Sequence, residues 1–215
     1  MALSTMLEQL STGMIRSIGI FVLTLVFSMP LGMLITFGRM SKYRVIRNIA
    51  RLYISILRGT PLMLQLLVVY FAPFYLWGAN ISGYRFSAVI IGFSLNYAAY
   101  FAEIYRGGIE AVPRGQYEAA QVLGYTRSQT FLRIVLPQVT KNILPAVTNE
   151  VITLVKDTSL AFALAYQEVF SIAKQISAAQ TSFMPFVIAG IFYYVFNLLV
   201  AFIMEKCEAK MNYYR

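Results

Sequence analysis

Long uncharged stretches dominate the chain, and their lengths predict helices that cross a membrane. Four segments contain no charged residue over 17 to 30 positions: 17–38, 59–84, 86–102 and 175–204. A helix needs about 20 mostly apolar residues to cross the hydrocarbon core of a bilayer. A fifth apolar stretch, 142–166, is interrupted by Glu150, Lys156 and Asp157. The pattern predicts an all-α membrane protein with five transmembrane helices, at about 15–38, 56–77, 86–105, 141–165 and 184–204.

The composition supports a protein whose surroundings are largely lipid. Hydrophobic residues make up 59% of the 215 positions and charged residues only 13%, whereas about a quarter is usual in soluble domains. The first apolar run is too long for a cleaved signal peptide and lacks a basic segment before it, so we expect it to remain as a span. A single transmembrane domain is predicted over 1–215.

The absence of histidine and the single cysteine exclude several kinds of site. The chain has no histidine, and its one cysteine is Cys207. An intrachain disulfide, a metal site built on histidines or paired cysteines, and histidine-based catalysis are therefore excluded. We predict no metal site and no catalytic residue.

Basic residues gather in alternate connections between the predicted spans. Three connections hold one each: Arg16, Arg85 and Lys174. The two connections that alternate with these hold five each: Arg39, Lys42, Arg44, Arg47 and Arg51 in the first, and Arg106, Arg114, Arg127, Arg133 and Lys141 in the second. The C-terminal tail holds three: Lys206, Lys210 and Arg215. This alternation predicts an outside N-terminus and a cytoplasmic C-terminus, because Lys and Arg favour cytoplasmic connections. The net charge of +9 thus follows membrane topology, and no nucleic-acid partner is expected.

The connection at about 110–137 is predicted to form two short cytoplasmic helices. Pro113 and Gly115 break the preceding helix. Residues 116–123 are good helix formers, and Gly124 suits a C-terminal stop. Ser128 is the expected cap of the second helix.

The same connection resembles the EAA loop of ATP-binding-cassette (ABC) importer permeases. That loop has Glu-Ala-Ala, three residues, Gly, nine residues, Ile, one residue and Leu-Pro. Here the pattern is complete from Glu118 through Ala119, Ala120 and Gly124 to Pro137. The resemblance implies a coupling helix in a groove of a separate ATPase, with small alanines for close approach and a glycine for the bend. Glu118 is then an anchor to the ATPase or to a local backbone N–H, the alternative being a solvated helix residue.

Three further segments resemble the polar amino acid permeases of that class: Arg58-Gly59-Thr60-Pro61, Glu103-Ile104-Tyr105-Arg106-Gly107-Gly108 and Lys156-Asp157-Thr158-Ser159-Leu160. The resemblance extends over about 13–213. It implies the type I importer permease fold in a prokaryotic inner (cytoplasmic) membrane and a polar amino acid as substrate. It also implies two ATPase copies, an extracytoplasmic amino acid-binding protein and a second permease, expected to be an identical copy although a paralogue stays open.

The chain contains no Gly-Lys dipeptide and hence no phosphate-binding loop of the ATPase type. We therefore expect no cofactor in this chain and no enzymatic activity of its own. ATP and Mg would be bound, and ATP hydrolysed, by the partner ATPase.

Polar residues inside the predicted fourth span are candidates for the substrate pathway, because charges in a membrane are costly. Glu150, Thr153 and Asp157 follow one another at i, i+3 and i+7 and share one helix face, with Asn149 beside it. An alternative for Asp157 is an ion pair with Lys156, or a bend that breaks the span.

A second polar stripe lies in the predicted third span. Asn96, Tyr100 and Glu103 recur at i, i+4 and i+7, and Asn96 and Glu103 are the candidate pathway residues. Two structural alternatives stay open: Glu103 pairs with Arg106, and Asn96 forms a hydrogen bond between helices.

Glu150 motivates a hypothesis about the substrate, because the nearest charged residue in sequence is Lys156. Its partner is either Arg58 of another span or a cationic substrate, so we predict transport of basic amino acids such as arginine. An ion-coupled secondary transporter or channel would also explain the intramembrane acids, but not the EAA pattern. A membrane enzyme using Lys156 and Ser159 is the third interpretation.

Overall fold

A computed structural model describes residues 3–211, and over these residues the all-α prediction is confirmed. Arg215 and the outermost ends of the predicted 1–215 domain lie outside this part. The helices are α1 Leu3–Arg39, α2 Arg44–Gly59, α3 Leu62–Trp77, α4 Arg85–Glu110, α5 Arg114–Val122, α6 Arg127–Thr130, α7 Leu136–Asp157, α8 Val169–Gln180 and α9 Met184–Met211. A π-helical turn, η1 Phe131–Val135, precedes α7, and a 3₁₀ segment, η2 Thr158–Leu164, follows it.

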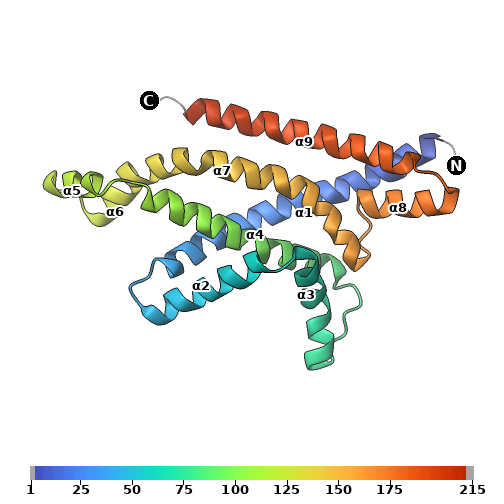
Figure 1. The fold of residues 1–215 in the computed structure, drawn as a ribbon, viewed down its shortest axis with the longest axis horizontal. Coiled ribbons are helices and arrows are strands. Elements are labelled where there is room, and N and C mark those ends of the chain that lie inside the picture. Colours follow the sequence, from blue (N-terminus) through green and yellow to red (C-terminus); the bar gives the residue numbers. More distant parts are fainter. Residues whose placement is uncertain (1–2, 212–215) are drawn as a thin grey trace.

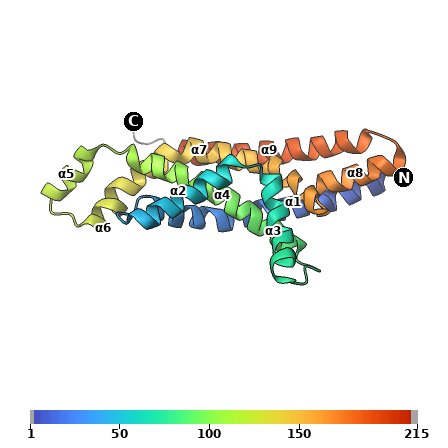
Figure 2. The ribbon, with the colours of Figure 1, turned by 60° about the horizontal axis from the view of Figure 1, so that its bottom comes forward.

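The long helices run along the long axis of the molecule; α1 begins at one end, and α9 ends towards the other, short of α5 and α6 (Figure 1). Helix α4 lies between α7 and α2, while α1 crosses behind (Figure 1). Helices α5 and α6 project at one end, and α8 lies at the other, near the N-terminus. Figure 2 shows α3 leaving this bundle sideways. Within residues 3–211, the basic-rich connections therefore lie towards the end that carries α5 and α6.

In the part of the chain that the structure describes, three helices, α1, α4 and α9, are long and apolar enough to cross a membrane. The pair α2–α3 is a fourth candidate if it is counted as one span bent by 113°. Helix α7 is not among these candidates, and its first turns carry several polar residues: Gln138, Thr140, Lys141 and Asn142. The count of five spans therefore stays a prediction.

The predicted span at 56–77 is not one continuous helix. Thr60 takes an extended backbone conformation, with φ −123° and ψ 149°, between α2 and α3. Pro61 explains this, because its ring disfavours the helical conformation of the residue before it. The break turns the chain sideways into α3.

Helices α1 and α4 approach closely at Gly32. A Cβ atom on Gly32 would lie 2.8 Å from the Cβ of Phe101 and 3.1 Å from the carbonyl oxygen of Ala98. One turn further along, the Thr36 hydroxyl lies 3.0 Å from the carbonyl oxygen of Ala102 and donates across the interface. Small residues and hydroxyl hydrogen bonds are typical of helix packing in membranes, where lipid removes most of the hydrophobic driving force.

Helices α4 and α7 are joined in the same way next to the projecting helices. A Cβ atom on Gly108 would overlap the side chain of Ile143 on α7. A buried apolar cluster surrounds this contact: Ile109, Val112, Val135 and Val139, with Phe131 and Ile143 packed against it. Helix α4 is thus the element that connects α1 to α7.

We predict that Gly32→Ala destabilises the protein. The added methyl would meet the Phe101 Cβ and the α4 backbone, neither of which can move aside cheaply, so we expect a cost of about 1–3 kcal/mol. The measurement is the thermal unfolding midpoint in detergent. Gly19→Ala on the same helix is the control, because its Cβ would meet no atom within 4 Å. Equal midpoints for the two variants would contradict the close packing.

Candidate functional site

The projecting unit contains the two short helices that were predicted, with one correction at the cap. Gly124 follows α5 with φ +77°, a left-handed conformation that glycine adopts readily. The cap of α6 is Thr126, and the prediction of Ser128 was wrong. Thr126 is the preferred cap because it forms a reciprocal capping box: its Oγ1 accepts from the Gln129 N–H, and its own N–H donates to Gln129 Oε1.

The π-helical turn η1 connects this unit to α7 ahead of Pro137. Proline has no N–H and cannot donate to the carbonyl one helical turn back. The π-helical turn accommodates the missing hydrogen bond, since the N–H of Leu136 donates to the carbonyl oxygen of Phe131, five residues earlier. Phe131 also meets Phe37 at the end of α1, with 6.5 Å between ring centroids. The turn that carries the projecting unit therefore contacts both α7 and α1.

The exposed face of α5 differs from the sequence expectation in one respect. Glu118 and Ala119 are exposed, but Ala120 is only 1% exposed, so its small size serves packing inside the unit. Val122 and Leu123 are 88% and 72% exposed at the tip. Sequence reasoning missed these two, although an apolar pair at the end of a polar helix was a usable signal. Exposed apolar patches of this kind mark interaction sites.

The break between α2 and α3 is closed by two side-chain amides. Gln65 Nε2 lies 2.9 Å from the carbonyl oxygen of Leu57 and 3.0 Å from that of Thr60. Asn96 Nδ2, from α4, lies 3.0 Å from the same Leu57 oxygen and 2.9 Å from Gln65 Oε1. Asn96 is buried. The hydrogen bond between helices foreseen as an alternative thus exists; contact of Asn96 with substrate stays a prediction.

A second helix break follows Asp157, where α7 gives way to η2. Asp157 Oδ2 accepts a hydrogen bond of 2.7 Å from the Tyr97 hydroxyl of α4. The carbonyl oxygens of Val155 and Lys156 accept from the hydroxyls of Thr158 and Ser159, both at 2.8 Å. Asp157 is therefore the last α-helical residue of the predicted fourth span, and a bend at this point stays a prediction. Helix α3 packs against η2, which brings the two breaks close together.

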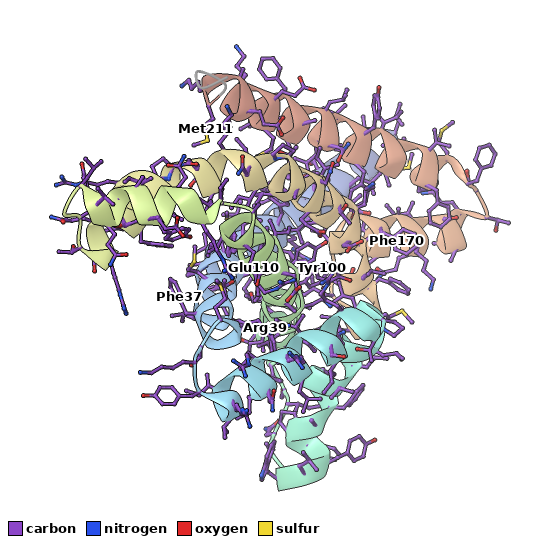
Figure 3. All side chains as sticks on the ribbon, turned by 60° about the vertical axis from the view of Figure 1, so that its left-hand side comes forward. Phe37, Arg39, Tyr100, Glu110, Phe170 and Met211 are labelled. Carbon is purple, nitrogen blue, oxygen red and sulfur yellow. The ribbon has the colours of Figure 1, made fainter. Side chains whose placement is uncertain are left out.

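Glu103 lies in an ion-pair network at the side of α4. Its Oε2 lies 2.7 Å from Arg106 Nη2, and its Oε1 lies 3.9 Å from Arg39 Nε. Arg106 also pairs with Glu110, the next acid along the helix. Figure 3 shows Tyr100, Arg39 and Glu110 around α4 between α7 and α2. The predicted Glu103–Arg106 pair is present, and any direct role of Glu103 in transport stays a prediction.

Glu150 is half-buried on α7, and within residues 3–211 it forms no ion pair. Arg58 is near enough to Glu150 to attract it electrostatically. The Arg58 guanidinium lies over the Tyr100 ring, 5.2 Å from its centroid. Thr153 and Asn149 lie exposed beside Glu150, and the Thr153 hydroxyl donates to the Asn149 carbonyl oxygen at 2.8 Å. The arrangement places a negative charge and exposed polar groups on α7 and a positive charge on α2.

Sequence reasoning also missed Glu168, which is fully buried between η2 and α8, outside the predicted spans at 141–165 and 184–204. Its carboxylate accepts from the N–H groups of Phe170 and Ser171, both at 2.7 Å, and from the Tyr193 hydroxyl at 2.9 Å. Burial raises the pKa of Glu168 to about 6, although these hydrogen bonds oppose the shift. Glu168 caps the N-terminus of α8 and joins α8 to α9 through Tyr193. In the sequence, the only sign of this role was its position directly before an apolar helix.

Comparison with known proteins identifies relatives along almost the whole chain. The model of the family described as "binding-protein-dependent transport system inner membrane component" matches residues 28–213. The arginine transport system permease protein ArtQ of Bacillus subtilis is 38% identical over 93% of this chain and 91% of its own. A putative glutamine transport system permease protein, GlnP of Rickettsia conorii, is 38% identical over 88% and 87%, respectively.

Solved structures show the same fold. A crystal structure of an amino acid ABC transporter with histidines contains a chain with a TM-score of 0.86 and 30% identity, covering 98% of this chain and 99% of that one. The MetNI methionine ABC transporter in an inward-facing conformation gives a TM-score of 0.79 at 18% identity, covering 99% and 100%. At that identity the second match shows the fold alone.

We predict that Gln65→Leu destabilises the protein. It would remove the amide that bonds to the Leu57 and Thr60 carbonyl oxygens, and Asn96 would lose one of its two acceptors, Gln65 Oε1, so we expect a cost of about 1–3 kcal/mol. The thermal unfolding midpoint in detergent again provides the measurement. Met63→Leu, an apolar exchange in the first turn of α3, is the control and should leave the midpoint nearly unchanged. A Gln65→Leu midpoint equal to that of the control would show that the amide does not hold the break.

Proposed function

The chain belongs to the family of binding-protein-dependent transport system inner membrane components, and from this premise we propose that it is the permease subunit of an ABC importer that moves polar amino acids into the cell. The observation that carries the proposal is the α5–α6 unit, which projects from the end of the helical bundle with an apolar tip (Figures 1 and 2). The EAA pattern begins in α5 at Glu118 and continues through α6 and η1 to Pro137 in the first turn of α7. A transported amino acid agrees with the names of the relatives.

The proposed topology has five spans, with the N-terminus outside and the C-terminus in the cytoplasm of a prokaryotic cell. Three observations support it: α1 begins and α9 ends towards opposite ends of the molecule, the described parts of the basic-rich connections lie towards one end, and α2–α3 can serve as one bent span. In this topology α7 with η2 forms the fourth span. Its polar face is then turned to the pathway and shielded from lipid, as is usual for ionisable groups within membranes. The whole of 1–215 forms one transmembrane permease domain.

The energy source in this proposal is a separate ABC ATPase that binds ATP and Mg. It docks on the face of α5 formed by Glu118, Ala119, Val122 and Leu123, all of which are exposed. Ala120 packs inside the α5–α6 unit, and Gly124 forms the bend between the two helices. Two ATPases would serve two permeases, the second being an identical copy. An extracytoplasmic amino acid-binding protein would deliver the substrate at the opposite end, where α8 lies.

A basic amino acid is the proposed substrate. Glu150 supports this, because it is a half-buried carboxylate that forms no ion pair within the described residues. Together with Asp157 it places two acids beside exposed Thr153 and Asn149. The relatives include permeases named for arginine, glutamine and L-cystine, so the family as a whole does not fix the charge of the substrate. The preference for a cation rests on Glu150.

The alternative function is an ion-coupled secondary transporter or channel, which would use the same intramembrane acids without an ATPase. It leaves the exposed Val122 and Leu123 at the tip without a partner. Isolation of the chain with a stable ATPase would exclude the alternative. An enzyme that uses Ser159 and Lys156 has less support, since the Ser159 hydroxyl donates to the backbone carbonyl oxygen of Lys156.

Val122→Asp is expected to weaken ATPase docking by about tenfold or more, because it puts a charge into the centre of an apolar contact. The measurement is the amount of ATPase that co-purifies with the tagged permease, followed by the basal ATP turnover of the complex. The matched control is Gln121→Asp, which adds the same charge at the neighbouring exposed position. Equal loss in both variants, or loss in neither, would contradict docking at the tip.

Glu150→Gln is expected to raise the arginine concentration needed for half-maximal ATP turnover by about tenfold or more, since it removes the charge that balances the cation. Stimulation by glutamine in the same reconstituted transporter should change little, and serves as the internal control. An unchanged response to arginine would reject the substrate preference. Equal loss for both amino acids would show that Glu150 is structural.

A further inference from the structure

A pocket of about 380 Å³ lies between α7 and α9, beside a hydrogen bond that joins the two helices. Helices α7 and α9 run side by side (Figure 1), and the buried Thr148 hydroxyl of α7 donates to Glu208 Oε1 of α9. The pocket has a mixed lining of charged and apolar side chains, which includes Lys141, Leu144 and Pro145 of α7 and Glu205, Glu208 and Ala209 of α9. Its volume falls within the about 300–1,000 Å³ that is usual for small-molecule sites.

The charged lining residues lie on the faces that the two helices turn towards each other. Lys141 precedes Thr148 by seven residues, and Glu205 precedes Glu208 by three, so each pair shares one helix face. Lys206 follows Glu205 directly but belongs to another face, where its ammonium lies over the Phe202 ring, 4.9 Å from the centroid. The pocket therefore presents one ammonium from α7 and two carboxylates from α9.

The protein leaves these charges largely without partners. Within residues 3–211, Lys141 and Glu205 form neither an ion pair nor a side-chain hydrogen bond, and Glu208 accepts one hydrogen bond, from Thr148. Lys141 and Glu208 are half-buried. Charges interact more strongly at a partly enclosed surface than in open water. A ligand with the opposite arrangement of charges would therefore find both signs available in one pocket.

We propose that this pocket binds a basic amino acid, with its α-carboxylate on Lys141 and its α-ammonium and side-chain cation on Glu205 and Glu208. At neutral pH such a molecule carries one negative and two positive groups, which is the complement of the lining. A neutral amino acid leaves one carboxylate of the pocket unbalanced, and a cation without a carboxylate leaves the ammonium unbalanced. Leu144 and Pro145 provide apolar surface for the aliphatic part of the ligand.

The pocket is separate from the candidate substrate pathway. None of the pathway candidates lines it, and Lys141 precedes Glu150 by nine residues, which is about 14 Å along an α-helix. In the proposed topology the pocket lies at the cytoplasmic end, where an imported amino acid would be released. This placement rests on the proposed function, whereas the ligand class rests on the charges and volume of the pocket.

Equilibrium binding of radiolabelled L-arginine to the full-length chain, purified in detergent with its associated subunits, tests the site. All variants carry Glu150→Gln, which weakens the proposed pathway site. We expect one arginine per chain and a dissociation constant that E205Q/E208Q raises about tenfold or more. Glutamine at position 208 still offers an oxygen to the Thr148 hydroxyl, so the contact between α7 and α9 should persist. No arginine binding, or binding that E205Q/E208Q leaves unchanged, would overturn the proposal.

Lys141→Gln separates a built site from a general attraction of cations to acidic residues. It makes the pocket more negative, so a general attraction would strengthen arginine binding. We expect the opposite, a loss of about tenfold, because the α-carboxylate loses its partner. Agmatine, which is arginine without the carboxylate, should bind no more weakly than before. Lys206→Gln is the matched control and should change neither affinity. Arginine binding strengthened alike by Lys141→Gln and Lys206→Gln would overturn the site.

The two proposals fail separately. Arginine binding that is lost in E205Q/E208Q but is the same with and without Glu150→Gln would reject the pathway's preference for a cation and keep the pocket. An importer whose ATP turnover responds to arginine through Glu150, but whose arginine binding ignores E205Q/E208Q and Lys141→Gln, would do the reverse.

Discussion

The structure depends above all on the need of every backbone polar group in a membrane to find a partner within the protein. Two helices are nevertheless interrupted, after Gly59 and after Asp157. Each interruption is covered by side chains: the amides of Gln65 and Asn96 at the first, and nearby hydroxyls at the second. Broken helices are tolerated where they line a cavity rather than lipid, and transporters use them to build polar sites. The two breaks meet through α3 and η2, and this is where we place the substrate pathway.

Helix α4 gives these sites a common frame. It contacts α1 at Gly32, α7 at Gly108 and the α2–α3 break through Asn96. Close contacts between backbones leave little room for independent sliding, so a displacement at the α5–α6 unit would reach α4 and α7 together. For a displacement of that unit to change the pathway, the packing between these helices must have two discrete arrangements. The contact of Phe131 with Phe37 adds α1 to the elements that would respond.

The sequence predicted the parts that follow from local chemistry. Uncharged length identified α1, α4 and α9, and spacing identified the α5–α6 unit with its glycine bend. The predictions were less complete where long-range contacts decide. The small size of Ala120 was assigned to a partner, but the residue is buried within the unit itself. Thr126 rather than Ser128 caps α6, because the choice depends on which side chain receives the reciprocal bond from Gln129. No sequence pattern revealed that Asn96 would close a break 39 residues away.

The π-helical turn between α6 and α7 has a consequence for how this end of the molecule can move. A π turn holds one residue more than an α turn of the same chain, and one residue corresponds to about 100° of rotation and about 1.5 Å of rise. If η1 became regular α-helix, everything before it would swing around the axis of α7 by about that angle. The α5 tip would then have two discrete orientations, one for the π-helical and one for the α-helical form of η1, instead of a continuous range.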